Sequence, residues 1–123
     1  MFFNLPGKTV YSGVTFASLV GLFTAQSPKA LTVSGNERDR GIVWENVFEA
    51  IFNQKAVPVS FLMRQAVSTG LDFNGGVNIL SSTELIADIY FIVGGVKPGE
   101  GLIITRDRSK AADIWRLDTG EGR

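Results

Sequence analysis

"YFIVGGVKPGEGLIITRDR", Tyr90 to Arg108, decides the fold, because it contains two apolar runs joined by a turn sequence. Pro98 fixes the φ angle of the first middle position of a type II turn, and Gly99 accepts the positive φ of the second. The stretch therefore predicts a hairpin. Its first strand begins within "IADIYFIV" (86–93), which is so continuously apolar that we expect a central strand covered on both faces.

The N-terminal third of the chain has the two-residue period of strands. "KTVYSGVTF", Lys8 to Phe16, alternates apolar and polar side chains and predicts a half-buried strand. "LVGLFTAQSP" (19–28) continues in strand-forming residues until Ser27-Pro28, where proline removes a backbone donor and restricts the residue before it. "ALTVS" (30–34) predicts another short strand, which a turn at Gly35-Asn36 would end.

The middle of the chain changes to a helical period. Apolar residues at i, i+3, i+4, i+7 and i+8 predict one helix from Trp44 to Phe52 and a second from Val59 to Val67. Pro58 precedes the second helix, where the start of a helix tolerates proline. A third helix is predicted from Phe73 to Leu80, although Gly75-Gly76 costs it about 1 kcal/mol per glycine relative to alanine.

The order of these elements indicates the fold class. Strands come first, helices follow, and strands return in the hairpin and in "ADIWRLD" (112–118). This order is typical of an α+β layered domain and not of alternating βαβ units. With 123 residues, 45% of them hydrophobic, the chain has room for one domain with a core.

The composition excludes several classes of function. Twelve basic residues balance twelve acidic ones, which removes the electrostatic argument for a nucleic-acid partner. The chain has no Cys and no His, so disulfides, zinc sites built from these residues and imidazole-based triads are excluded within it. The longest apolar stretches are shorter than the roughly 20 residues of a membrane-spanning helix, and the first residues do not resemble a secretory signal.

Two short motifs invite a catalytic interpretation that their context does not support. "GGVKPGEG" (94–101) is glycine-rich, but it lacks the Gly-Lys-Ser/Thr order and no helix follows it, so a phosphate-binding loop is not expected. Ser109-Lys110 suggests a serine nucleophile with a lysine base. Adjacent residues on a strand point to opposite faces, so this spacing argues against that pair.

Two charged segments need an interpretation. "NERDRG" (36–41) lies between the early strands and the first predicted helix, in the kind of loop where a rigid scaffold presents functional groups. Alternatively it is a solvated approach to the helix, with Asp39 near the positive N-terminal end. "TRDR" (105–108) is predicted to be a solvated strand end whose charges pair among surface loops.

Five segments together resemble a known family in order and spacing: "GLFTAQSPKALTVSGNERDRG", "WEN", "PVSFLMR", "IADIYFIVGG" and "GEGLIITRDR". They are similar to the catalytic β-subunit of N-acylethanolamine-hydrolysing acid amidases and, more distantly, to acid ceramidases. The match runs from about Val10 to Asp118. The resemblance implies a lysosomal N-terminal-nucleophile hydrolase, an αββα sandwich that cleaves itself into an α-subunit and a β-subunit.

The resemblance also implies a reaction: hydrolysis of fatty acid ethanolamides to fatty acid and ethanolamine, without a cofactor. In this family the amino-terminal cysteine is the nucleophile and its own α-amine is the base, so no histidine is required. The chain contains no Cys, so residues 1–123 are expected to be an incomplete catalytic β-subunit domain. The alternatives are ceramide hydrolysis, or an inactive short product that acts as a lipid-binding or interaction module. Peripheral contact with a lipid surface stays open.

Two site residues carry over from the family. Glu37, in "NERD", matches a glutamate close to the nucleophile that is linked to activation by acid, a role that a modestly raised pKa would suit. Phe23, in "GLFTAQSP", matches a position where the amidases have tryptophan beside the lipid-binding cavity. Phenylalanine keeps the apolar area of tryptophan but lacks the indole donor.

Overall fold

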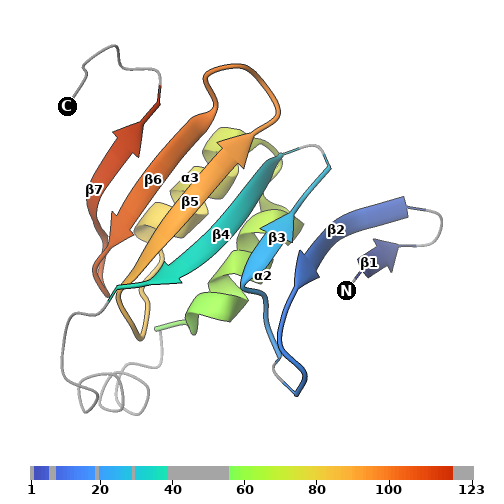
Figure 1. The fold of residues 1–123 in the computed structure, drawn as a ribbon, viewed down its shortest axis with the longest axis horizontal. Helices are drawn as coiled ribbons and strands as arrows, with labels where there is room; N and C mark the ends of the chain where they lie inside the picture. Colours follow the sequence, from blue (N-terminus) through green and yellow to red (C-terminus); the bar gives the residue numbers. More distant parts are fainter. Residues whose placement is uncertain (1, 6–7, 19, 29, 39–55, 118–123) are drawn as a thin grey trace.

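The computed structural model describes residues 2–5, 8–18, 20–28, 30–38 and 56–117. Within them the chain forms, in order, β1 (Phe2–Leu5), β2 (Lys8–Val14), β3 (Thr24–Gln26), β4 (Leu31–Glu37), α2 (Val59–Thr69), α3 (Phe73–Ser82), β5 (Ile89–Gly95), β6 (Gly101–Arg106) and β7 (Ala111–Arg116) (Figure 1). Strands, then helices, then strands again is the predicted order. The α+β class is therefore confirmed.

The strands of the described residues form one antiparallel sheet, in the order β1-β2-β3-β4-β5-β6-β7. Each strand pairs with its neighbour in sequence, and both helices lie in the connection between β4 and β5. Figure 1 shows α2 and α3 behind the same face of this sheet. Helix α2 packs on β2 to β4, and α3 packs on β5 and β6.

The core lies between the helices and the sheet face that they cover. Leu62, Met63, Ala66 and Val67 of α2 are buried, as are Phe73, Val77 and Leu80 of α3. They meet buried strand residues that include Leu31, Val33, Phe91, Val93, Leu102 and Ile104. The helical and strand periods predicted from the sequence therefore meet in one apolar cluster.

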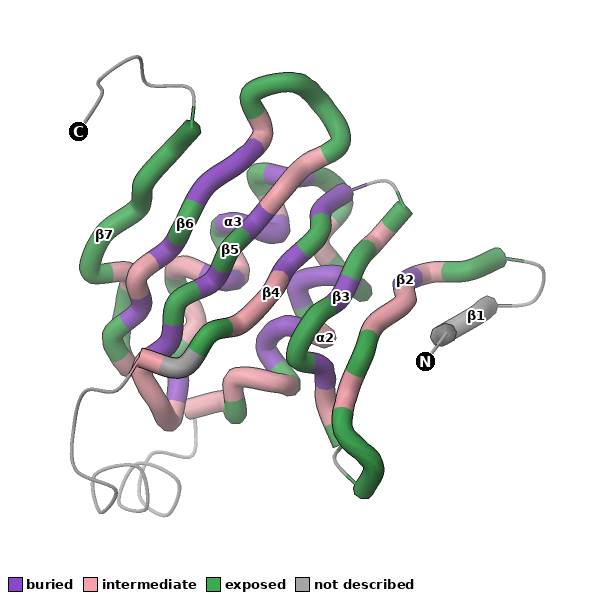
Figure 2. Tube along the Cα trace, in the orientation of Figure 1, coloured by how far each residue is buried: buried purple, intermediate pink, exposed green. Residues whose placement is uncertain are grey.

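Burial alternates along β5, so one prediction is corrected. Phe91 is fully buried under the helices, whereas Tyr90 and Ile92 are 36% and 46% exposed on the opposite side (Figure 2). The prediction that both faces of this strand are covered does not hold within the described residues, because both helices pack on one face. We call the other side the open face. It is lined by Ser12, Val14, Thr24, Gln26, Thr32, Asn36, Tyr90, Ile92, Ile103, Thr105 and Trp115.

The turn predicted at Gly35-Asn36 is wrong, because both residues belong to β4. Gly35 pairs with Phe91 and Asn36 pairs with Tyr90 in the ladder to β5. A Cβ added at Gly35 would lie 3.1 Å from the sulfur of Met63 in α2. Glycine therefore serves the close approach of α2 to the sheet here, a role that a turn signature does not distinguish.

The two predicted helices that fall within the described residues are confirmed. Helix α2 begins directly after Pro58, as the sequence indicated. Helix α3 is capped by Asp72, whose carboxylate accepts a hydrogen bond from the backbone N–H of Gly75 at 2.7 Å. The helix predicted from Trp44 to Phe52 lies outside the described residues.

The predicted hairpin joins β5 to β6 with the expected turn chemistry. Gly99 has a φ of 80°, and the N–H of Glu100 donates to the carbonyl of Lys97 at 3.2 Å. The Glu100 carboxylate also accepts hydrogen bonds from the backbone N–H groups of Val96 and Lys97, at 3.0 and 2.9 Å. These contacts fix the register that pairs β5 with β6.

The two glycines of α3 are expected to respond in opposite ways to alanine. A Cβ at Gly76 would overlap the Cδ2 atom of Leu31 in β4, whereas a Cβ at Gly75 meets only the Asp72 carboxylate, at 3.1 Å. Gly76→Ala should therefore destabilise the chain by about 1–3 kcal/mol through overpacking. Gly75→Ala, the matched control, should be neutral or stabilising by up to about 1 kcal/mol. Urea denaturation measures both, and equal effects would contradict the close packing of α3 on β4.

Candidate functional site

The two site residues predicted from the family resemblance lie near each other at one end of β4. Glu37 is the last residue of β4, and its backbone pairs with Ile89. Phe23 directly precedes β3, and its carbonyl accepts a hydrogen bond from Gly35, two residues before Glu37, at 3.1 Å. At roughly 3.3 Å per strand residue, Gly35, the partner of Phe23, and Glu37 are about 7 Å apart along β4. Their roles stay predictions.

Phe23 belongs to an exposed aromatic pair. Phe23 is 39% exposed, and its ring stands edge-to-face against Phe16, with 5.2 Å between ring centroids and 66° between planes. The preferred geometry of aromatic pairs is of this kind. Val14, whose carbonyl accepts from the N–H of Phe23, is also exposed. The segment around Phe23 thus presents apolar side chains to the surroundings.

The two charged segments of the sequence meet in space. Arg38, from "NERDRG", donates from Nη1 to Oδ1 of Asp107 at 2.6 Å and to the carbonyl oxygen of Arg106 at 3.2 Å. Its guanidinium carbon is 5.7 Å from the ring centroid of Tyr90. The hydrogen bond to the Asp107 carboxylate raises the pKa of Arg38 above its usual value. The prediction that the charges of "TRDR" pair is confirmed for Asp107.

Arg106 corrects the prediction that "TRDR" is a solvated strand end, because this side chain is fully buried. Its Nη1 donates to the carbonyl of Ser81 and its Nη2 to the carbonyl of Thr83. These carbonyls belong to the C-terminal end of α3, where the last backbone acceptors of a helix have no partner within it. Burial lowers the pKa of Arg106, and a positive charge at the negative end of the helix dipole offsets part of that cost.

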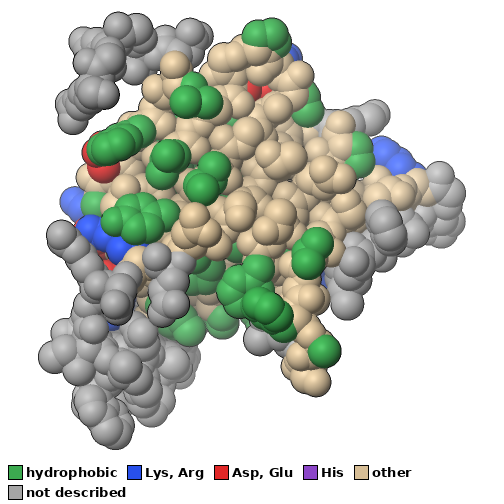
Figure 3. Space-filling model, in the orientation of Figure 1, with side chains coloured by type: hydrophobic (Ala, Val, Ile, Leu, Met, Phe, Trp, Pro, Cys, Tyr) green, Lys and Arg blue, Asp and Glu red, His purple; other side chains and the backbone are tan. Residues whose placement is uncertain are grey.

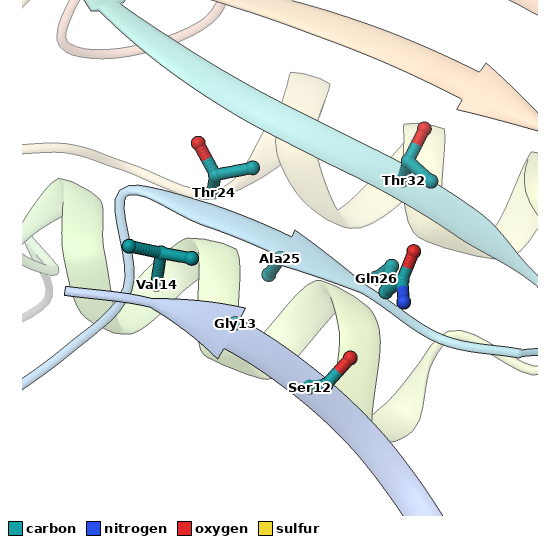
Figure 4. Close-up of a pocket in the computed structure, with 7 residues that line it drawn as sticks. All are labelled: Ser12, Gly13, Val14, Thr24, Ala25, Gln26 and Thr32. Carbon is teal, nitrogen blue, oxygen red and sulfur yellow. The ribbon is translucent and has the colours of Figure 1, made fainter. Parts of the chain in front are cut away.

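The open face carries two shallow hollows of different character. One, of about 370 Å³, lies over β4 to β7 and is lined by Asn36, Tyr90, Ile92, Ile103, Thr105 and Trp115. The other, of about 390 Å³, lies over β2 to β4, and Figure 4 shows the Ser12, Thr24, Gln26 and Thr32 side chains around it. Figure 3 shows exposed hydrophobic side chains gathered in two places on this face. The large side chains Tyr90, Ile92, Ile103 and Trp115 line the first hollow, whereas mainly Ser, Thr and Gln side chains line the second.

The described residues include neither Cys nor His. Among them no group of three or more acidic residues could hold a metal ion. Ser109 and Lys110 lie in the bend between β6 and β7. No helix in the described part of the chain is long and apolar enough to cross a membrane.

Comparisons with known proteins identify the relatives of the chain, although no protein-family model matches it. It is 51% identical over 116 residues to the N-acylethanolamine-hydrolyzing acid amidase of Cavia porcellus, covering 94% of this chain and 32% of that protein. The Rattus norvegicus amidase is 47% identical over the same shares. The chain belongs to this acid amidase family.

More distant relatives agree with this assignment. Acid ceramidase of Bos taurus is 38% identical over 125 residues, covering 98% of this chain and 31% of that protein. Among solved structures, the Caenorhabditis elegans N-acylethanolamine-hydrolyzing acid amidase ortholog has a TM-score of 0.81 and 34% identity, covering 96% of this chain and 50% of that one. The chain therefore spans about a third of the length of its curated acid amidase relatives.

Sequence reasoning about this acid amidase family member missed the contacts of Arg38 and of Arg106. It did not connect Arg38 with Asp107, because 69 residues separate them. It also did not place Arg106 under α3. A signal was present, because Arg106 lies two residues after Ile104 and four after Leu102, and every second residue of a strand points to the same face. Leu102 and Ile104 are buried, so this spacing could have predicted that Arg106 is buried too.

Proposed function

We propose that residues 1–123 form part of the catalytic β-subunit domain of an amidase that hydrolyses N-acylethanolamines to fatty acid and ethanolamine. This proposal rests on sequence identity to two groups of relatives, each of which matches nearly the whole of this chain. The chain is 47–51% identical to N-acylethanolamine-hydrolyzing acid amidases but 34–38% identical to acid ceramidases. Ceramide hydrolysis is the second candidate, favoured only by the lower of these similarities.

The proposed reaction requires a thiol that this chain does not contain. A cysteine freed at its amino terminus by self-cleavage of the precursor attacks the amide carbonyl, while its α-amine takes the thiol proton. The C–N bond then breaks and ethanolamine leaves with that proton. Water hydrolyses the resulting thioester and releases the fatty acid. The α-subunit of the same precursor is the proposed partner, and the acidic lysosome is the proposed compartment, which agrees with the word "acid" in the relatives' names.

This chain contributes structure and binding area to that scheme. We propose that the second sheet of the αββα sandwich packs on the open face, where Tyr90, Ile92 and Trp115 are exposed. Phe23, exposed beside the end of β4, would line the cavity for the acyl chain. Contact of the assembled enzyme with a lipid surface is part of the same proposal, because its substrate is a lipid amide.

A full-length chimera tests the proposed function. In it, this chain replaces the matching 116-residue segment of the Cavia porcellus amidase. Hydrolysis of a long-chain N-acylethanolamine and of a ceramide is then compared, with the unmodified Cavia porcellus enzyme as reference and the 123-residue chain alone as negative control. We expect a clear preference for the N-acylethanolamine. Preference for ceramide would favour the second candidate, and a self-cleaved chimera without either activity would support an inactive binding module.

Glu37→Gln is expected to slow self-cleavage or turnover of this chimera at acid pH. Glutamine has the same shape but cannot exchange a proton, so loss of a proton-transfer role should lower the rate by about a hundredfold or more. Gel analysis of the subunits measures processing, and release of fatty acid measures turnover. Glu84→Gln, an exposed change in the segment before Leu85, is the matched control. Unchanged processing together with unchanged turnover would show that Glu37 has no catalytic role.

A further inference from the structure

Arg38, the residue after Glu37, is more buried and has more partners than an ordinary surface charge. The Arg38 side chain is only 10% exposed, although it follows the end of a strand. Its Nη1 contacts both the Asp107 carboxylate and the Arg106 carbonyl, and its guanidinium lies over the Tyr90 ring. Planar stacking together with directed N–H donors is a combination that arginine offers and lysine does not.

Arg38 follows β4, and its anchors lie on or beside β5 and β6. Tyr90 is in β5, beside Asn36 in the register, and Arg106 is the last residue of β6. Because β5 separates β4 from β6 in the sheet, the Arg38 side chain crosses one strand to reach the end of the next. It ties the ends of three strands together at the end of the sheet where Glu37 lies.

We infer that Arg38 is a positioning residue that fixes the end of β4 and thereby places Glu37. The inference rests on the proposed function of Glu37. The backbone at Glu37 is held on one side by its pairing with Ile89 and on the other by the anchored side chain of Arg38. Displacing a catalytic group by about 1 Å can cost up to a hundredfold in rate, so the loss of this anchor should affect turnover.

The competing interpretation is an ordinary surface ion pair. Asp107 is 52% exposed, and an isolated exposed pair contributes little to stability. That interpretation predicts no effect on kcat when Arg38 is changed. The positioning role predicts a fall in kcat at nearly constant KM, because the substrate contacts stay in place while the reacting group moves.

The test uses the full-length chimera and single-residue variants. Arg38→Gln should lower kcat about tenfold with KM changed by less than about twofold, and Arg38→Lys should recover part of this loss. Lys110→Gln, which removes an exposed charge from the same β6–β7 turn, is the matched control and should leave kcat unchanged. If Arg38→Gln does not fold, Asp107→Asn removes the same ion pair at a half-exposed position and carries the test.

A double variant decides whether Arg38 acts through Glu37. In a Glu37→Gln background, Arg38→Gln should have little further effect, because the group that it positions is already lost. A kcat for Arg38→Gln within about twofold of the parent, or losses that add fully in the double variant, would overturn the inference while leaving the proposed function intact. An unmodified chimera without amidase activity would instead overturn the proposed function, and this inference with it.

Discussion

Replacing Arg106 with methionine is expected to destabilise the chain by about 2–4 kcal/mol. Methionine fills much of the same volume but cannot donate, so the carbonyls of Ser81 and Thr83 at the end of α3 would lose their charged donors. Hydrogen bonds from charged donors contribute about 1.5–3 kcal/mol each. Relief from burying a charge, the same effect that lowers the pKa of Arg106, offsets part of this loss.

Urea denaturation followed by circular dichroism at low protein concentration measures the effect of the Arg106 substitution. Lys110→Met, an equivalent change at an exposed position in the following turn, is the control and should shift the free energy of unfolding by less than about 0.5 kcal/mol. Equal urea midpoints for Arg106→Met and the unchanged chain would show that water or another group can donate hydrogen bonds to the carbonyls of Ser81 and Thr83. Arg106 would then have no capping role.

The isolated 123-residue chain is expected to self-associate through the open face, and two substitutions should suppress this. Ile92 and Ile103 are directly paired across β5 and β6, and they are 46% and 38% exposed. Together with Trp115 they form an apolar surface that nothing in the described residues covers. Threonine at both isoleucine positions keeps the strand preference and removes apolar area, so the monomer should predominate at concentrations where the parent chain aggregates.

Light scattering and analytical ultracentrifugation measure this association. Leu71→Thr is the matched control, because Leu71 is 92% exposed but lies between α2 and α3, away from the open face. It should leave association unchanged. A parent chain that stays monomeric and unfolds in a sharp, reversible thermal transition would contradict the prediction. That result would favour an independently folding module.

The local elements could be predicted from the sequence because their signals lie between near neighbours. The apolar period of 59–67 predicted α2, and Pro98-Gly99 predicted the turn of the β5–β6 hairpin. The order of strands and helices, and with it the α+β class, followed from these same periods. Family resemblance gave Glu37 and Phe23 their proposed roles, and these roles stay predictions. The structure adds that the carbonyl of Phe23 accepts a hydrogen bond from the N–H of Gly35, close to Glu37.

The arrangement of charges and glycines was decided only by the tertiary structure. Gly35 has the sequence character of a turn, yet it lies within β4 because α2 packs against it. Arg106 has the character of a surface residue, yet it is buried because the end of α3 offers it carbonyl acceptors. Arg38 meets Asp107 across 69 residues. Periodicity and turn preference report the conformation of neighbouring residues. The acceptors of a buried donor, and the side chain that occupies the space of a missing Cβ, belong to elements that only the fold brings together.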